Sequence, residues 1–234
     1  MSRDIRQFAP AATRNRDPIL DVLGRHLPTH GLVLEVASGT GEHITHFAAA
    51  FGAGLEFQPS DPEPGARASI DAWVAELGLT NVRPAIALDA ASAAWPIANA
   101  AAVLCINMIH IAPWSAAVGL VQGAARILSF LDAPSVAHQQ PARGGLLYLY
   151  GPFRRDGRHT SPGNASFDQQ LRQQNEAWGI RDLEAVAALA EAAGFLPPII
   201  ETMPANNLSL IFRRIESLRG MRFIAPATAG VRGA

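Results

Sequence analysis

The sequence contains no lysine, and all 19 basic residues of the 234-residue chain are arginine. A catalytic lysine, a Schiff-base lysine and the lysine-containing phosphate loop of P-loop proteins are therefore excluded. Cys105 is the only cysteine, which excludes an internal disulfide and a cysteine-based zinc site. A single cysteine is typical of a reducing compartment, so we expect a cytoplasmic protein.

Long apolar runs and a surplus of positive charge are also lacking. No apolar run approaches the ~20 residues that span a bilayer, and residues 1–10 show no signal-type apolar core. The formal net charge is −1, from 19 basic and 20 acidic residues, whereas nucleic-acid-binding proteins usually carry a basic excess. We expect a small-molecule partner, with neither nucleic acid nor membrane; the sequence does not define the oligomeric state.

Segments of strand and helix length alternate along the chain, whose 49% hydrophobic and 17% charged residues are typical of a globular domain. The pattern predicts strands at 31–36, 55–58, 82–88, 101–106, 146–150, 196–201 and 208–213. It predicts helices at 17–27, with Pro18 in the first turn, and at 42–51, 65–77, 114–128 and 181–193. Ile70, Trp73, Val74 and Leu77 are expected to face inward. Such alternation indicates an α/β fold, with a mostly parallel sheet between two layers of helices.

We predict a single domain over 1–214, followed by a loosely ordered tail at 215–234. The polar segment 129–143 is expected to be a surface insertion. The segment 151–180 is also polar and follows the end of a strand, where open α/β sheets bind their ligands. It is therefore the expected lid of a substrate site.

A strand, a glycine turn and a helix follow one another in Leu34-Glu35-Val36-Ala37-Ser38-Gly39-Thr40-Gly41-Glu42-His43. Glycine lets the backbone approach a ligand closely, and free amides at a helix start favour polar acceptor groups. A dinucleotide fingerprint needs a third glycine, and Ile44 occupies that position, which argues against NAD or FAD.

Three carboxylates, Glu35, Asp61 and Asp89, fall at the ends of three successive predicted strands. They suit a ligand with one ammonium group, two ribose hydroxyls and one adenine amine, which is S-adenosylmethionine (SAM). Taken alone, Asp61, which Pro62 follows, could simply start a turn, and Asp89 could be a cap. The predicted cofactor-binding residues are Asn15, Arg16, Glu35, Ala37, Ser38, Gly39, Gly41, Asp61, Asp89, Ala90 and Asn107.

Several longer segments closely resemble the methyltransferase-like 26 family, once a domain of unknown function numbered 938. They are Thr13-Arg14-Asn15-Arg16-Asp17-Pro18-Ile19-Leu20, Val36-Ala37-Ser38-Gly39-Thr40-Gly41-Glu42-His43, Phe57-Gln58-Pro59-Ser60-Asp61-Pro62, Asn107-Met108-Ile109-His110-Ile111-Ala112-Pro113-Trp114, Tyr150-Gly151-Pro152-Phe153 and Trp178-Gly179-Ile180-Arg181-Asp182. The resemblance covers Arg14 to Arg213. It implies the Rossmann-like class I methyltransferase fold, a seven-stranded sheet whose last strand is antiparallel. It implies no particular substrate, and the 129–143 insertion departs from the family.

His110 and Tyr150 are the predicted catalytic candidates. His110 has the side chain of a general base for an O- or N-nucleophile, or it is a packed structural histidine; both interpretations stay open. His43 and His46, three residues apart, lack a third metal ligand, so we predict no metal site and place them on a helix surface. The predicted substrate-binding residues are His110, Tyr150, Phe153, Arg154, Asn164 and Trp178.

Three functions fit these features. A SAM-dependent methyltransferase acting on a small molecule accounts for the loop, the carboxylates and the polar lid. Because no base is unmistakable, a non-catalytic SAM-binding scaffold or regulatory protein is the alternative. A nucleotide-dependent oxidoreductase ranks third, since the third glycine is missing.

Overall fold

The computed structural model describes residues 4–128 and 145–214. One mixed sheet has the strand order β2-β1-β3-β4-β8-β7. Strands β1 (Gly31–Val36), β2 (Leu55–Ser60), β3 (Ala102–Ile106) and β4 (Leu146–Arg155) are parallel to one another. The last strand, β8 (Asn207–Arg213), is antiparallel to both β4 and β7 (Ile199–Met203). The predicted fold, including its antiparallel last strand, is confirmed.

The predicted strand at 82–88 does not form a regular strand. It joins β2 only through two isolated parallel bridges, Phe57 with Val82 and Ser60 with Ile86. Pro59 in β2 and Pro84 in this segment both lack an N–H, so the hydrogen-bond ladder between them is interrupted. The segment nevertheless occupies the seventh position of the sheet, beyond β2.

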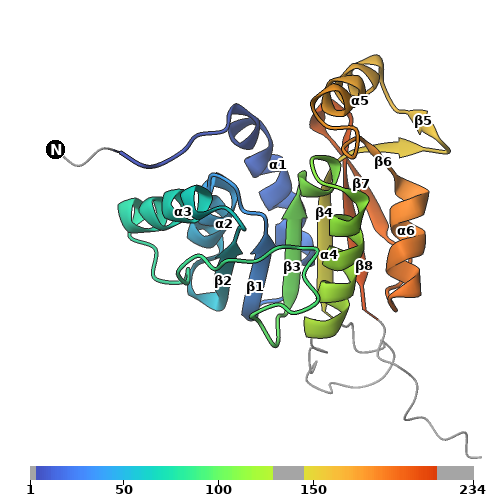
Figure 1. Ribbon diagram of the computed structural model, residues 1–234. Coiled ribbons are helices and arrows are strands. Elements are labelled where there is room, and N and C mark those ends of the chain that lie inside the picture. Colours follow the sequence, from blue (N-terminus) through green and yellow to red (C-terminus); the bar gives the residue numbers. More distant parts are fainter. Residues whose placement is uncertain (1–3, 129–144, 215–234) are drawn as a thin grey trace, which may run out of the picture.

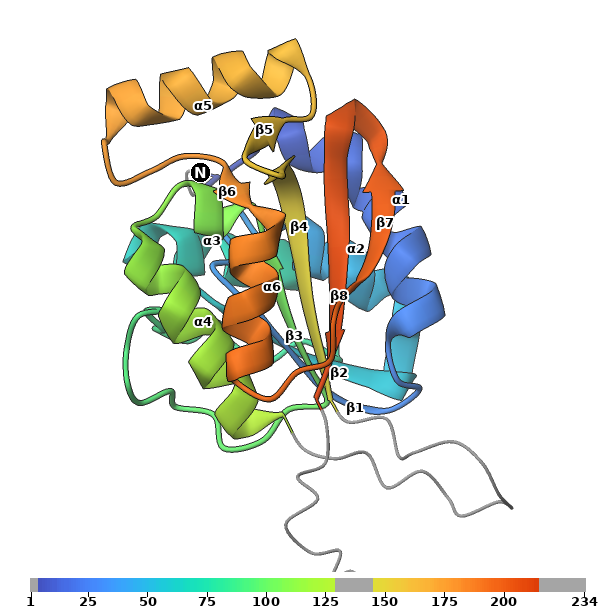
Figure 2. The ribbon, with the colours of Figure 1, turned by 90° about the vertical axis from the view of Figure 1, so that its right-hand side faces the viewer.

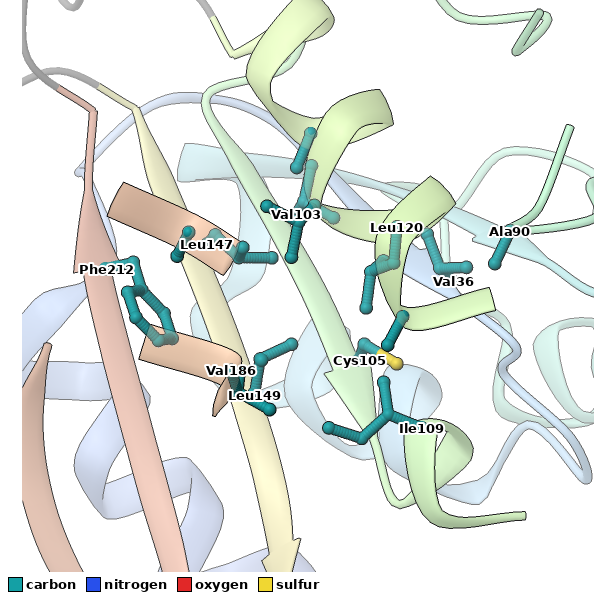
Figure 3. Packing of buried hydrophobic residues seen from close by; sticks show 14 of the residues in the cluster. Val36, Ala90, Val103, Cys105, Ile109, Leu120, Leu147, Leu149, Val186 and Phe212 are labelled. Carbon is teal, nitrogen blue, oxygen red and sulfur yellow. The ribbon is translucent and has the colours of Figure 1, made fainter. Parts of the chain in front are cut away.

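Helices cover both faces of the sheet (Figure 2). On one face lie α4 (Trp114–Ile127) and α6 (Leu183–Ala192), and on the other lie α1 (Pro10–His26), α2 (Glu42–Phe51) and α3 (Pro64–Leu77). Each face has its own buried cluster of apolar side chains. Figure 3 shows the first cluster, in which Leu120 of α4 and Val186 of α6 lie against Val103, Leu147 and Phe212 of the strands. This burial of apolar surface is the main force that holds the layers together.

Helix α1 begins at Pro10, seven positions before the predicted start, so Pro18 lies inside the helix. Both prolines are compatible with helical φ, and Pro10 takes the first-turn position expected for Pro18. In α3 the prediction for Leu77 was wrong, because this side chain is 48% exposed while Ile70 is fully buried. Helix α6 begins at Leu183, because the two preceding residues pair with β4.

The segment 151–180 contains regular structure that its polarity conceals. Strand β4 continues to Arg155 and pairs with two short strands, β5 (Arg158–His159) and β6 (Arg181–Asp182). Helix α5 (Pro162–Gln174) has Ser161 as its N-cap, whose side chain accepts a hydrogen bond from the Asn164 amide. Its buried residues are only Asn164, Asp168 and Leu171, so no apolar stripe marked it in the sequence.

The remaining short helices have the bounds Gly52–Gly54, Met108–His110 and Pro204–Asn206. Within 4–128 and 145–214, no helix combines the length and apolar character needed to cross a membrane. The predicted insertion at 129–143 and the predicted tail at 215–234 lie outside the described residues.

Candidate functional site

The carboxyl ends of the parallel strands meet at one edge of the sheet (Figure 1). In the register, Val36 of β1 lies beside Ser60 of β2, and Ile106 of β3 lies beside Tyr150 of β4. The fold therefore brings the glycine loop after β1, Asp61 after β2 and Asn107 after β3 to the same edge. This is where open α/β sheets bind ligands.

The glycine loop has left-handed backbone at Ala37, Gly39 and Gly41, with φ of 58°, 56° and 92°. It is fastened to β2, since the Ser38 amide donates to the Ser60 carbonyl at 2.8 Å. The Ser60 hydroxyl donates to the Glu35 carbonyl at 2.7 Å. The loop thus has a fixed conformation that glycine makes accessible.

The two glycines of this loop serve different purposes. A Cβ on Gly41 would lie 2.9 Å from the Cα of Ile70 in α3, whereas a Cβ on Gly39 would have nothing within 4 Å. Gly41 is therefore required by packing between the loop and α3. Gly39 faces open space, as a backbone that a ligand approaches should.

This difference predicts different effects of two alanine substitutions. In Gly41→Ala, the new side chain suffers both the strain of a left-handed backbone and a clash with the backbone of α3. This substitution should lower the free energy of unfolding by about 3 kcal/mol. Gly39→Ala should lower it by about 1 kcal/mol, the strain alone. Urea unfolding of both variants checks the ranking, and equal losses would contradict it.

Asp61 is 7% exposed and organises the turn after β2. Its Oδ2 accepts from the Gly39 amide at 3.0 Å, and its Oδ1 accepts from the Glu63 amide at 3.0 Å. A carboxylate has about four acceptor positions, so both oxygens can accept further hydrogen bonds. Asp61 thus joins the glycine loop to the second strand and keeps acceptor capacity.

Glu35 is 1% exposed, and its Oε2 has no hydrogen-bond partner among the described residues. Burial raises the pKa of Glu35 to about 7, the charge of Asp61 adds to this rise, and the Ser38 side chain opposes it. A buried carboxylate oxygen without a partner is unfavourable unless a donor or a cation completes it. The site therefore fits a ligand that brings an ammonium group.

Asp89 and Ala90 follow the bridged segment beside β2. Asp89 is exposed, and its Oδ1 accepts from the Ala91 amide at 2.9 Å, so it caps the turn that follows, as the alternative interpretation of its sequence had it. Ala90 is 6% exposed, and a Cβ on Gly119 of α4 would lie 2.3 Å from its carbonyl oxygen. Close packing on α4 fixes Ala90; contact of either residue with an adenine stays a prediction.

Asn15 and Arg16 of α1 lie against α2. The Asn15 Oδ1 is 2.7 Å from the Nε2 of His43. Burial lowers the pKa of His43 to about 4, and His46 and Arg16 lower it further. His43 and His46, expected on an ordinary helix surface, are partly buried, because Asn15 and Asp17 of α1 contact them at 2.7 and 2.8 Å. No three His, Cys, Asp or Glu side chains in 4–128 and 145–214 gather in a way that would hold a metal ion.

His110 packs against β4 and is 1% exposed. The Arg181 amide donates to its Nδ1 at 3.4 Å, and its ring meets Phe153 edge-on at 4.9 Å. A Cβ on Gly151 would lie 2.5 Å from its Nε2, so this glycine makes room for the ring. Burial lowers the pKa of His110 to about 3, and the charge of Arg181 lowers it further. The imidazole is therefore neutral at physiological pH.

Asn107 has a left-handed backbone, with φ of 63°, and its amide donates to the Tyr150 carbonyl at 2.8 Å. Tyr150 is 2% exposed and Phe153 is fully buried. Burial raises the pKa of the Tyr150 hydroxyl, against hydrogen bonds with Asn15 and Asn207. In this conformation both rings belong to the core, and their contact with a substrate stays a prediction.

Arg154, Asn164 and Trp178 all lie in the predicted lid. Arg154 donates to Asp182 at 2.7 Å, so a carboxylate already engages it. Asn164 donates through Nδ2 to Thr160 at 2.9 Å and to the carbonyl of residue 206 at 3.0 Å, which ties α5 to the turn before β8. Trp178 is partly buried. The segment that contains them lies beyond the carboxyl ends of the strands (Figure 2), and Arg154 and Asn164 are each engaged within the protein.

Arg181 and Ser60 are important to the site and were missed in the sequence. The Arg181 guanidinium donates to the carbonyls of Ile109, Ala112 and Ala177 at 2.9, 2.6 and 2.9 Å, which fastens the loop after β3 to the 151–180 segment. Both residues stand in segments that resemble the methyltransferase-like 26 family. Nothing local singles either of them out, because each acts through carbonyls that only the fold brings near. A hollow of about 520 Å³ beside α3, lined by residues such as Val74 and Leu79, contains none of the predicted site residues.

Comparison with known proteins agrees with this fold. A family model described as "Protein of unknown function (DUF938)" matches residues 6–214. An O-methyltransferase family protein from Burkholderia thailandensis superposes with a TM-score of 0.70 at 18% identity, covering 88% of this chain and 58% of that one. Human N-acetylserotonin methyltransferase, solved in complex with SAM, gives 0.63 at 13% identity, covering 88% and 53%.

A smaller protein, YcgJ from Bacillus subtilis, gives a TM-score of 0.60 at 12% identity, covering 87% of this chain and 99% of that one. In contrast, the chain spans little more than half the length of the O-methyltransferase family protein and of N-acetylserotonin methyltransferase. At these identities the comparisons establish the shared fold.

Proposed function

The chain belongs to the DUF938 family of proteins of unknown function, whose model matches residues 6–214, and we propose that it is a SAM-dependent methyltransferase acting on a small-molecule acceptor. The same proposal places it with the methyltransferase-like 26 proteins and in the cytoplasm. It rests on one observation above the others: a buried carboxylate, Glu35, with an unpartnered oxygen beside the glycine loop. The similarity in fold to methyltransferases supports it.

In the proposed site, each residue meets one part of the cofactor. Glu35 receives the ammonium group, Gly39 offers the open backbone surface, and Asp61 accepts from the ribose hydroxyls. SAM, when bound, supplies a methyl group on a sulfonium, which is a leaving group already activated. The protein then mainly positions the acceptor in line and excludes water, tasks that we assign to the loop after β3 and the 151–180 segment.

Titration calorimetry tests the cofactor assignment. SAM and S-adenosylhomocysteine should both bind to the folded protein, and NAD, used as the control, should not. Binding of NAD in the absence of any response to SAM would favour an oxidoreductase instead. If none of the three ligands binds to the folded protein, the proposal that the protein is an enzyme fails.

A second function, a SAM-binding scaffold or regulatory protein, is favoured by the burial of both candidate catalytic side chains. His110 is 1% and Tyr150 is 2% exposed. This alternative predicts SAM binding without methyl transfer to any member of a broad acceptor panel. A stable protein partner in pull-down experiments would support it, and turnover of any acceptor would exclude it.

The low proton affinity of His110 predicts how activity depends on pH. Its pKa is lowered to about 3, so the ring stays neutral from pH 5 to pH 8 and causes no inflection of kcat/KM in that range. The profile should instead follow the ionisation of the acceptor and of Glu35. An inflection between pH 5 and pH 8 that persists in Glu35→Gln and disappears in His110→Gln would contradict this prediction.

A further inference from the structure

The first described residues, 4–9, form a segment that we call the N-terminal strap. Figure 1 shows it passing from α1 toward α3. The Gln7 amide donates to the Ser69 hydroxyl at 2.8 Å, and the Trp73 indole donates to the Gln7 carbonyl at 3.1 Å. The Phe8 ring meets Trp73 edge-on at 5.0 Å, and Arg6 lies 4.9 Å over the same ring. The strap is therefore docked on α3 by specific contacts.

The same side chains also hold the glycine loop. Ser69 is fully buried, and its hydroxyl donates to the Thr40 carbonyl at 2.8 Å while it accepts from the strap. The Glu42 Oε2 accepts from the Thr40 hydroxyl at 3.0 Å and from the Ala9 amide at 2.5 Å. Thr40 lies between the two glycines of the loop. Two side chains thus connect the strap to one residue of the loop.

This connection matters because the loop is conformationally demanding. Its left-handed residues include Ala37, for which this backbone is unfavourable, and such strain persists only where surrounding contacts enforce it. If the strap leaves, the Ser69 hydroxyl and the Glu42 carboxylate each lose a donor. Their hold on Thr40 must then change, because a buried polar group seeks another partner.

We infer that docking of the strap and binding of the cofactor are coupled, with Ser69 as the positioning residue that transmits the coupling through Thr40. The inference rests on the proposed function, since it concerns the same cofactor site. Coupling between two equilibria is reciprocal. Strap docking therefore increases the affinity for SAM, and SAM binding increases the equilibrium constant for strap docking by the same factor.

A pair of substitutions at Gln7 isolates the strap without touching the core. Gln7→Pro removes the amide that donates to Ser69, whereas Gln7→Ala keeps it and loses only the side-chain bond to the Gly65 carbonyl. Calorimetry should show SAM affinity about tenfold lower in Gln7→Pro, the effect of one hydrogen bond. In Gln7→Ala it should fall by at most about twofold, because the bond that is lost is exposed to solvent and does not involve Ser69. Equal affinities in the two variants would overturn the inference.

Ser69→Ala tests the positioning role itself. Its matched control is Ser209→Ala, because Ser209 is also fully buried and its hydroxyl lies 2.7 Å from that of Tyr148, in the sheet. Both variants should lose stability, but only Ser69→Ala should bind SAM about tenfold more weakly. Equal effects of the two variants on binding would reduce Ser69 to a structural residue.

The reciprocal effect is measured by trypsin cleavage after Arg6. S-adenosylhomocysteine should slow this cleavage in the wild-type protein and in Ser209→Ala, but not in Ser69→Ala. Protection that is equal in Ser69→Ala would overturn the coupling. A folded wild-type protein that binds neither SAM nor S-adenosylhomocysteine would instead overturn the proposed function, and this inference with it.

Discussion

Asp61→Ala should lower the affinity for SAM by about 100-fold or more. Two ribose hydroxyls that donate to a charged acceptor contribute about 1.5–3 kcal/mol each, and every 1.4 kcal/mol corresponds to about a factor of ten. The substitution also releases the Gly39 and Glu63 amides, which the carboxylate now holds at 3.0 Å each. The loop therefore loses both a ligand contact and a support. Titration calorimetry with SAM and S-adenosylhomocysteine measures the loss.

A matched control separates the two roles of Asp61. The Asp71 carboxylate also accepts a hydrogen bond from a backbone amide, that of Ala85, at 2.9 Å. Asp71 lies in α3, outside the proposed site. Asp71→Ala should cost less stability than Asp61→Ala, because Asp71 is exposed and holds a single amide, and it should leave SAM affinity unchanged. If Asp61→Ala binds SAM as tightly as Asp71→Ala does, Asp61 is only a turn residue, and the assignment of the ribose site fails.

The strands that contain mainly apolar residues could be predicted from the sequence. Buried parallel strands are continuous apolar runs, so β1 was predicted with its observed bounds and β3 within one residue. The bridged segment beside β2 was predicted as a full strand, because hydropathy does not register that Pro59 and Pro84 interrupt a ladder. Helix α5 was missed for the opposite reason, since it buries only one apolar side chain, that of Leu171.

The positions of the proposed cofactor residues were easier to predict than the surroundings of the proposed acceptor residues. Glu35, Gly39 and Asp61 sit at strand ends, and the topology alone brings strand ends together. The states of His110 and Arg154 depend instead on tertiary partners: Arg181 contacts the ring of His110, and Asp182 pairs with Arg154. No local pattern predicts such partners. The same is true of Ser69, whose two hydrogen-bond partners lie 62 and 29 positions away in the sequence.

Glu35→Gln should make the ligand-free protein more stable at pH 8 and weaken its binding of SAM. Burial raises the pKa of Glu35 from 4.5 to about 7 in the folded state. The folded protein therefore retains a proton that the unfolded chain releases, and stability falls as pH rises from about 4.5 to 7 and stays low above it. Glutamine removes this loss, which is on the order of 3 kcal/mol at pH 8. Thermal unfolding should show an advantage for the variant at pH 8 that shrinks by pH 5.

The same substitution should reverse its effect when the cofactor is added. In the wild-type protein the Glu35 carboxylate must be ionised to bind an ammonium group, so SAM affinity should rise from pH 6 to pH 8 as the proton leaves. In Glu35→Gln the affinity should be at least tenfold lower at pH 8 and should lack this rise, because a desolvated charge pair is lost. Glu56→Gln is the control: this glutamate is exposed on β2 and pairs with Arg83 at 2.6 Å, so it should change neither the pH dependence nor the binding. A Glu35→Gln protein that gains stability at pH 8 yet binds SAM normally would mean that the buried carboxylate lowers the stability of the protein and does not contact the cofactor.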